Sequence, residues 1–237
     1  MQPTFTAVHN FSVSKAHETQ LRLSHKIISE DRLPRRIKCV AGVDVAYVDE
    51  LAIGGVVVLD YKTFELLEQQ TITCEVKFPY IPTLLAFREI PATFACIRKL
   101  RRQPDVFMVD GQGIAHPYGC GLASHLGLAL GKPTVGVAKK KLIGVSKSIA
   151  GEEFLFQRDK RIGAVVSTKE GAKPVYVSVG HLVSLGTAVK IVKHCARNSK
   201  IPEPILRAHK VVTEKKHAIQ KKRKTLIELS VKTKNRY

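Results

Sequence analysis

The chain has 237 residues, of which 39 are lysine or arginine and 20 are aspartate or glutamate, so its formal charge is +19. This length suits one domain with a substantial core, and a hydrophobic share of 44% excludes a wholly disordered chain. No apolar run approaches the ~20 residues of a membrane span, and residues 1–10 lack a signal-peptide pattern. Five scattered cysteines without C-x-x-C spacing disfavour disulfides and a cysteine zinc site, so we expect a reducing, cytoplasmic compartment.

The positive charge is concentrated at the C-terminal end. Residues 190–237 hold 15 basic and 3 acidic residues, a net charge of +12. Such a segment favours a polyanionic partner, most commonly nucleic acid. A solubilising tail and an anionic membrane surface are the alternatives. The KKRK run at residues 221–224 would also serve as a nuclear address in a eukaryotic cell.

The first half of the chain predicts one helix and three strands. Residues 12–33 have the pattern of an amphipathic helix, capped by Ser14 and stopped by Pro34. Strand-like segments follow at residues 39–48, 53–60 and 64–76. The links between these three segments are short, which indicates antiparallel hairpins.

The pattern then changes to alternating helices and strands. We expect helices at 83–102 (interrupted at Pro91), 119–130, 187–195 and 206–224, and strands at 105–109, 134–138, 162–167 and 175–179. The order predicts an α/β fold: a mixed sheet of three antiparallel hairpin strands followed by parallel strands, with flanking helices. No linker divides the chain, so we predict a single domain over residues 1–237, with a basic C-terminal extension from about 221.

Three carboxylates stand out against this background. Asp44 interrupts an apolar strand, Asp110 ends another, and Glu89 lies within the helix that follows a proline-rich turn. If the two strands are neighbours, the two aspartates converge, and Glu89 faces them from the covering helix. Oxygen ligands of this kind suit Mg²⁺ or Mn²⁺ and the metal-dependent cleavage of phosphodiesters. The alternative is that each carboxylate is structural: a hydrogen-bonded core acid, a turn cap and a surface group.

Histidine and lysine residues accompany these acids. His116 follows the glycine-rich turn and His209 lies in the predicted C-terminal helix, where each is either a structural residue or a group that positions water. Lys139 begins a KKK run after an apolar strand, which is either a solvated turn or a phosphate contact.

Six sequence segments, taken together, resemble the endonuclease V family. They are GVDVAY (42–47), FPYIP with LLAFRE and P (78–91), DGQGIAHP with GLASHLG (110–127), KPTVGVAKKKL (132–142), YVSVGHLVSL with TAV (176–189) and PEPILRAH (202–209). They occur in the family's order. The resemblance implies a ribonuclease-H-like fold and a Mg²⁺-dependent endonuclease that cuts the second phosphodiester bond 3′ to inosine in DNA, and in several members acts on RNA.

The resemblance also implies roles for individual residues. Asp44 and Asp110 match the family's metal-binding aspartates, and Glu89 matches its third acidic residue, so all three are the expected metal ligands. His209 matches the residue that completes the site, and Lys139 a lysine near the scissile phosphate. The residues at positions that line the family's lesion pocket and strand path are Gly111, Gly113, His116 and Leu142.

The PYIP segment matches the family's wedge. An aromatic ring, Tyr80, can fill the space that an extruded base leaves. The two prolines, Pro79 and Pro82, flank Tyr80 and Ile81 and stiffen the loop. Without this context the segment would be interpreted as the turn before a helix. Thr83 departs from the family, which usually has glycine here, so we expect a tighter or differently selective pocket.

Three functions follow for testing. The first is an endonuclease that depends on Mg²⁺, for which Mn²⁺ can substitute, and that acts on inosine in DNA or RNA. We expect this enzyme to be a monomer and not to associate with a membrane. The second is a different nucleic-acid enzyme on the same fold, because Thr83 can alter the choice of substrate. The third is a module that binds nucleic acid without turnover, because the C-terminal segment is so basic.

Overall fold

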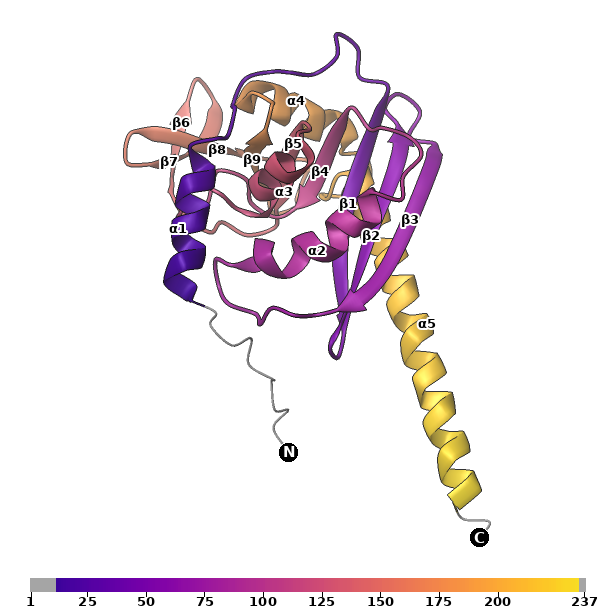
Figure 1. Cartoon of the computed structure of the whole chain (residues 1–237). Coiled ribbons are helices and arrows are strands. Elements are labelled where there is room, and N and C mark those ends of the chain that lie inside the picture. The colour runs from indigo at the N-terminus through magenta and orange to yellow at the C-terminus, as the bar shows by residue number, and fades with distance from the viewer. Residues whose placement is uncertain (1–11, 235–237) are drawn as a thin grey trace.

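The structure is a computed structural model that describes residues 12–234, and the side chains as far as residue 226. Within these residues a single sheet runs through the molecule, with helices on both of its faces (Figure 1). The helices are α1 (Val13–Ser24), α2 (Leu85–Ile97), α3 (Leu122–Leu130), α4 (Leu185–Cys195) and α5 (Glu203–Lys234). The strands are β1 (Cys39–Val48), β2 (Leu51–Asp60), β3 (Leu66–Glu75), β4 (Val106–Asp110), β5 (Thr134–Ala138), β6 (Val145–Ile149), β7 (Glu152–Gln157), β8 (Lys160–Val166) and β9 (Val175–His181).

The order of the strands confirms the predicted α/β architecture. The nine strands of the described part lie in the order β3-β2-β1-β4-β5-β9-β8-β7-β6. β1, β2 and β3 form antiparallel hairpins, whereas β1, β4 and β5 are parallel neighbours. β1 and β5 have the bounds predicted from their apolar sequences. The chain therefore crosses the sheet in the predicted hairpin-then-crossover order.

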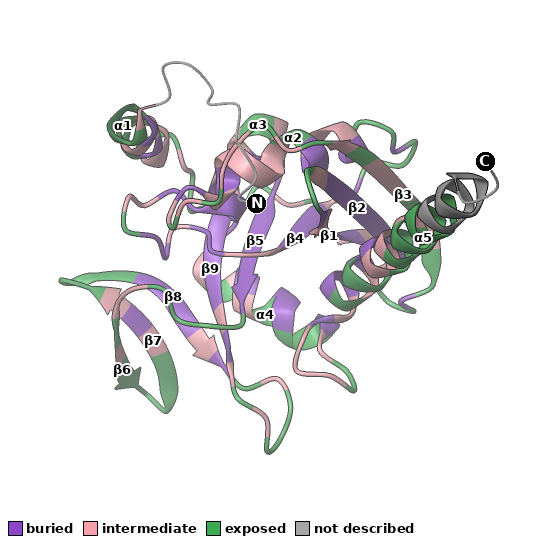
Figure 2. Cartoon of the chain, turned by 90° about the horizontal axis from the view of Figure 1, so that it is seen from below, coloured by how far each residue is buried: buried purple, intermediate pink, exposed green. Residues whose placement is uncertain are grey.

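Alternate residues of the central strands pack into two separate cores. Val57 and Leu59 contact the cluster that includes Ala188 of α4 and Ile205 of α5. Val56 and Val58 contact the cluster built from α2 and α3. This alternation follows from the period of two in a strand. Figure 2 shows the central strands buried, the edge strand β6 largely exposed, and much exposed surface on the described part of α5.

Several predicted elements differ from those observed. Ser12, not Ser14, caps α1, because its side chain accepts from the Lys15 N–H. The helix ends at Ser24, well before Pro34. In the segment beyond it, the Ile28 N–H donates to His181 Nδ1 and the Ile28 oxygen accepts from the Leu182 N–H. α2 is shorter than predicted and contains Pro91 without a break. β6 and β7 were not predicted at all.

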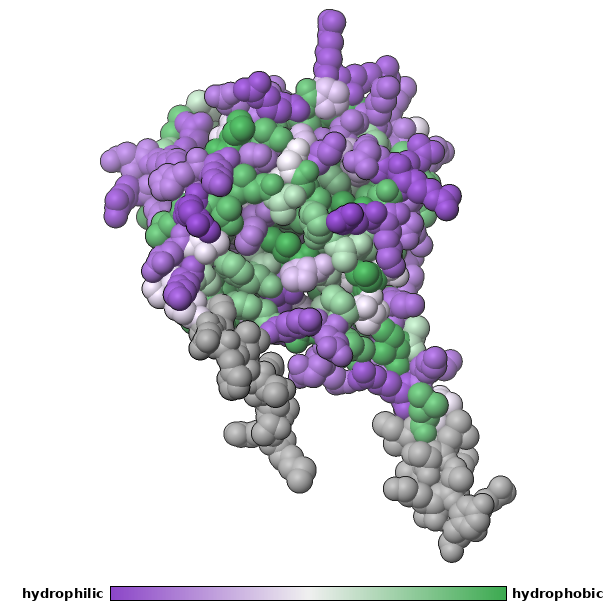
Figure 3. Space-filling view, viewed as in Figure 1, coloured by the Kyte–Doolittle hydropathy of each residue, from purple (hydrophilic) through white to green (hydrophobic). Residues whose placement is uncertain are grey.

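Two further predictions concerned a signal peptide and membrane-spanning segments. The prediction that residues 1–10 are not a signal peptide concerns residues outside the described range. No helix in the described range 12–234 is long and apolar enough to cross a bilayer. On the face that carries α2 and α3, hydrophobic side chains gather in the middle and hydrophilic ones around the rim (Figure 3).

Candidate active site

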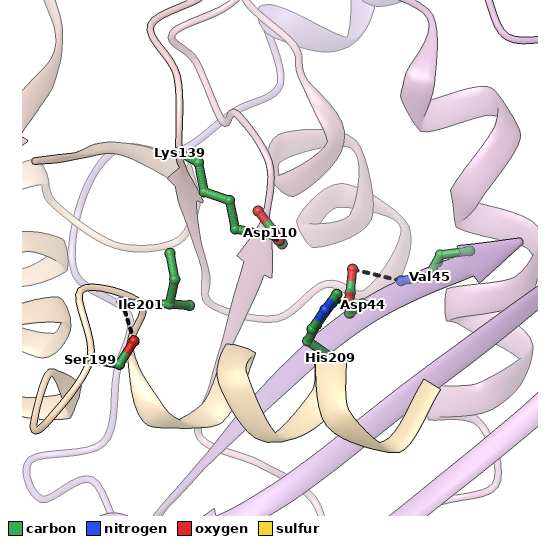
Figure 4. A network of polar contacts seen from close by, with 7 residues as sticks. All are labelled: Asp44, Val45, Asp110, Lys139, Ser199, Ile201 and His209. Carbon is green, nitrogen blue, oxygen red and sulfur yellow. Dashed lines mark hydrogen bonds and ion pairs between the residues drawn. The ribbon is translucent and has the colours of Figure 1, made fainter. Parts of the chain in front are cut away.

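The two aspartates lie side by side on the neighbouring central strands β1 and β4, at the level where β4 ends. β1 and β4 are parallel and Val43 pairs with Val109, so Asp44 and Asp110 occupy the next position on each strand. Alternate residues of a strand face the same side of the sheet, so Asp44 lies on the side of Val40 and Asp110 on the side of Met108. Val40 and Met108 belong to the core beneath α5. Figure 4 shows their carboxylates next to each other, above α5. The predicted convergence of the two strand ends is confirmed.

Asp44 is held by α5 and by its own strand. Its Oδ2 lies 2.7 Å from His209 Nδ1, and its Oδ1 accepts from the Val45 N–H at 2.9 Å. Burial raises the pKa of the Asp44 carboxyl, the hydrogen bond from His209 opposes this rise, and the charge of Asp110 adds to it. The side chain is 14% exposed, so Asp44 is a partly buried acid that opens to solvent at the edge of the sheet.

A glycine lets α5 approach Asp44. A Cβ on Gly42 would lie 1.9 Å from the backbone oxygen of Pro204, at the beginning of the helix. Only glycine allows this backbone-to-backbone contact. The close packing of α5 against β1 places His209, two turns along the helix, over the aspartates.

Asp110 has a cationic partner from the neighbouring strand. Lys139 follows β5, which is parallel to β4, and its Nζ lies 2.5 Å from Asp110 Oδ2. The Asp110 side chain is 18% exposed and that of Lys139 is 45% exposed. Lys139 is therefore at the same edge of the sheet as both aspartates and is accessible to a phosphate.

Glu89 completes a group of three acids. It lies on α2 and accepts a hydrogen bond from the Tyr47 hydroxyl at 3.3 Å, while the Arg88 guanidinium stacks over the Tyr47 ring. Burial, and then the charges of Asp44 and Asp110, raise the pKa of Glu89 to about 8. The helix thus brings a third carboxyl into the electrostatic reach of the aspartate pair, as predicted.

The carboxylates of this group are suitable ligands for a divalent cation, although their side chains do not converge on one point in this structure. Among the described residues, no three His, Cys, Asp or Glu side chains are close enough to share an ion. His209 and Lys139 instead engage the two aspartates. Carboxylate oxygens are the preferred ligands of Mg²⁺ and Mn²⁺. Burial, and then the charges of Asp44 and Asp110, disfavour the ionised form of Glu89, and a cation would favour that form.

A cavity of about 510 Å³ opens beside Asp110 and Lys139. It contains most of the residues that the sequence assigned to base and strand recognition: Tyr80, Ile81, Pro82, Thr83, Gly111, His116 and Leu142. Tyr80 is 70% exposed at its mouth. Gln112 also lines the cavity, and its buried Oε1 has no hydrogen-bond partner among the described atoms. Gln112 was not predicted as a site residue, because no sequence pattern distinguishes its amide from those of other turn residues.

Two predicted residues lie outside this cavity. Gly113 packs against β9, where a Cβ would lie 1.9 Å from the Val179 oxygen, and its N–H donates to Ser178 Oγ. Its role is close packing, so the structure does not place it with the pocket residues. Pro79 precedes the lining segment and is not among the cavity residues.

Thr83 adopts a left-handed backbone conformation with φ of +72°. This conformation favours glycine, which explains in backbone terms why a glycine suits this position. Two side chains donate to the Thr83 oxygen, Gln20 Nε2 at 2.8 Å and His116 Nε2 at 2.9 Å. His17 Nε2 lies 2.9 Å from the Thr83 hydroxyl. The loop is thereby held to α1, a connection that the sequence analysis did not predict.

His116 is a neutral structural donor. Its Nε2 donates to Thr83, and its Nδ1 accepts from the Tyr118 N–H at 3.3 Å, which fixes the tautomer. Burial lowers the pKa of His116 to about 4. His116 therefore shapes the cavity wall without carrying charge at neutral pH.

The chain is similar to known proteins along most of its length. The family model described as Endonuclease V matches residues 21–210. Endonuclease V from Thermofilum pendens is 42% identical over 206 residues, which cover 86% of this chain and 89% of that protein. Endonuclease V from Dictyoglomus thermophilum is 41% identical over 194 residues, covering 80% and 85%.

Solved structures agree with these sequence matches. Endonuclease V from Streptomyces avermitilis superposes with a TM-score of 0.82 at 34% identity, covering 91% of this chain and 98% of that one. The Ciona intestinalis enzyme in complex with a 24mer DNA containing an inosine followed by a ribo-adenosine gives 0.79 at 31% identity, covering 87% and 98%. With the paired aspartates, the third acid and the adjoining cavity in place, the chain belongs to the endonuclease V family.

Proposed function

We propose that the chain is a Mg²⁺-dependent endonuclease that recognises inosine in DNA or RNA and cleaves the second phosphodiester bond on its 3′ side. The observation that carries this proposal is the group of acids Asp44, Asp110 and Glu89, of which Asp110 also lines a cavity walled by the Tyr80 loop. The Ciona intestinalis relative bound to inosine-containing DNA supports the choice of base. The activity would serve the repair of deaminated DNA or the processing of inosine-containing RNA.

The residues of this site have distinct tasks in the proposed reaction. Asp44 and Asp110 would hold the ion, with Glu89 contributing directly or through a water. When bound, Mg²⁺ would lower the pKa of a water and stabilise the leaving 3′ oxygen. His209 orients Asp44 and positions the attacking water, and Lys139 offsets charge on the phosphate.

The cavity and its aromatic rim explain how a base would be recognised. A base inside a helical stack is inaccessible, so it must be extruded before it is recognised. The exposed Tyr80 ring is placed to fill the gap that the base leaves. Backbone groups around Gly111 and the unpartnered Gln112 Oε1 are available to hydrogen-bond the extruded base.

The test is cleavage of a labelled strand with a single central inosine, made as DNA and as RNA. We expect a nick one nucleotide beyond the inosine's own 3′ linkage with Mg²⁺ or Mn²⁺, and none with EDTA. Asp44→Ala and Asp110→Ala should bind the strand without cutting it. Asp159→Ala, which changes an exposed carboxylate of the β7–β8 turn, is the matched control. Wild-type rates in either site variant, or preference for another modified base, would refute the proposal.

A further inference from the structure

The second half of α5 has a position and a charge that the proposed reaction does not use. α5 carries His209 near its beginning and continues to Lys234, away from the body of the molecule (Figure 1). The match to the family model ends at residue 210. The outer helix is therefore a feature of this chain beyond the matched region, joined without interruption to the active site.

The body of the protein sets the direction of this helix. Val212 and Ile219 pack in a small apolar cluster with Val48 and Ile53 of the β1–β2 hairpin. Further along, Arg223 forms an ion pair with Asp49 in the β1–β2 turn. These contacts hold α5 against the strand that bears Asp44 over about four helical turns. The basic residues near them consequently have a defined position relative to the site.

Positive charge surrounds the helix beyond His209. Among residues 211–226 there are six lysines and arginines and one acid, Glu214. Of these cations only Arg223 has a carboxylate partner within the described side chains. Four consecutive cations at 221–224 point in all directions around the helix, and like charges three and four residues apart destabilise it. A polyanion lying along this surface would relieve that repulsion.

The site geometry decides which part of a strand would reach α5. The cavity lies beside Asp110 and Lys139, on β4 and β5, whereas α5 contacts β1 and β2 on the other side of Asp44. Figure 4 shows Lys139 next to Asp110 and, further along, Asp44 with His209 of α5 below it. With the base in the cavity and the cut bond at the aspartates, the strand continues past His209 on its 3′ side.

We propose that residues 215–224 of α5 form a phosphate-binding arm that holds the nucleic-acid segment 3′ to the cut. The assignment of this arm to the 3′ side of the cut rests on the proposed function. At about 1.5 Å per residue, Lys224 lies roughly 22 Å along the helix from His209. That distance corresponds to about six phosphates at about 3.4 Å each along one strand of a duplex. The arm binds charge and not sequence, because lysine contacts to phosphate carry no base information.

The test compares two quadruple variants of the full-length protein. In the arm variant Lys215, Lys221, Lys222 and Lys224 become glutamine, and Arg223 is retained because it anchors the helix. In the control variant four exposed lysines outside α5 become glutamine: Lys62, Lys160, Lys173 and Lys190. Binding to an inosine duplex is measured by fluorescence anisotropy in EDTA, from about 50 to about 200 mM salt.

The arm variant should lower the slope of log affinity against log salt by about 3 to 4, because each phosphate contact contributes about 0.9. The control should lower it by less than about 1. Shortening the 3′ flank should weaken the wild type but not the arm variant, whereas shortening the 5′ flank should weaken both equally. Single-turnover cleavage at saturating enzyme should be unchanged in the arm variant, which shows that the site is intact.

Equal slopes in the two variants would overturn the arm proposal. So would an arm variant that remains as sensitive to the length of the 3′ flank as the wild type. So would a loss of binding to vesicles of anionic lipid with binding to the duplex unchanged. Failure of the wild type to cut at inosine would instead refute the proposed function. The salt slope on an inosine-free duplex still tests the arm in that case, so the two failures are distinguishable.

Discussion

Replacing Glu89 by glutamine should make the metal-free protein more stable at neutral and alkaline pH. Burial and the charges of Asp44 and Asp110 raise the pKa of Glu89 to about 8, from 4.5 in the absence of these effects. The folded chain therefore retains this proton in a range of pH where the unfolded chain has lost it. Ionisation of Glu89 therefore stabilises the unfolded chain more than the folded chain. Glutamine does not ionise, so the variant lacks this loss of stability.

The direction and size follow from proton linkage. Below about pH 4.5 Glu89 is protonated in both states and has no effect on the free energy of unfolding. Between about pH 4.5 and about pH 8 the unfolded state gains from ionisation, so stability falls as pH rises. At about 1.4 kcal/mol for each pKa unit, the loss is about 3 kcal/mol at pH 7 and about 5 kcal/mol above pH 8. Asp44, whose pKa is also raised, contributes in the same direction and remains in the variant.

Urea unfolding in EDTA at a series of pH values measures this effect. Wild type and Glu89→Gln should be close in stability near pH 5 and diverge as pH rises, with the variant the more stable. Glu170→Gln, which changes an exposed acid, should follow the wild type throughout. Mg²⁺ should stabilise the wild type more at pH 8 than at pH 6, because ligation favours the ionised carboxyl. A difference between wild type and Glu89→Gln that does not change with pH would refute the reasoning.

Substitutions at three further positions test the placement of α5 and of the Tyr80 loop. Gly42→Ala should cost about 1–3 kcal/mol of stability by urea unfolding and slow cleavage, because a Cβ 1.9 Å from the Pro204 oxygen must displace α5 and with it His209. Thr83→Gly should be more stable than Thr83→Ala by about 1 kcal/mol in thermal unfolding, since only alanine keeps the cost of the positive φ. Tyr80→Ala should leave the melting temperature unchanged but weaken binding to an inosine strand about tenfold, because the ring is exposed and available to stack on bases.

The predictability of each element reflects the strength of its burial pattern. β1 and β5 lie in the interior and are apolar on both faces, so their sequences marked them with their observed bounds. β6 and β7 lie at the edge of the sheet and are mostly exposed, so no alternation distinguished them from loops. The prediction for α1 was too long because Ile27 and Leu33 are apolar for another reason: they pack on the core from an extended segment.

The site was predictable where it follows from topology. Asp44 and Asp110 each follow an apolar stretch on neighbouring parallel strands, and that arrangement brings them together. The contacts of Thr83 with His17 and Gln20 join residues more than 60 positions apart, and neither donor interrupts a pattern. Such a contact depends on how α1 docks, which local propensities do not determine.

The acidic residues of the candidate site and the basic residues of α5 would have complementary effects on a nucleic-acid strand. The charges of Asp44 and Asp110 raise the pKa of Glu89, and the charge of Asp110 also raises the pKa of Asp44. This group of carboxyls forms a negative region that would repel a phosphodiester strand. In the proposed reaction, Lys139 and a bound cation would compensate charge only at the scissile phosphate. Cations placed along α5 add attraction at distances where the carboxyls no longer dominate, because salt screens charges beyond about 10 Å. Positive charge on the arm at residues 215–224 would therefore favour binding of the strand. It would do so without pairing with the carboxylates proposed to bind the metal.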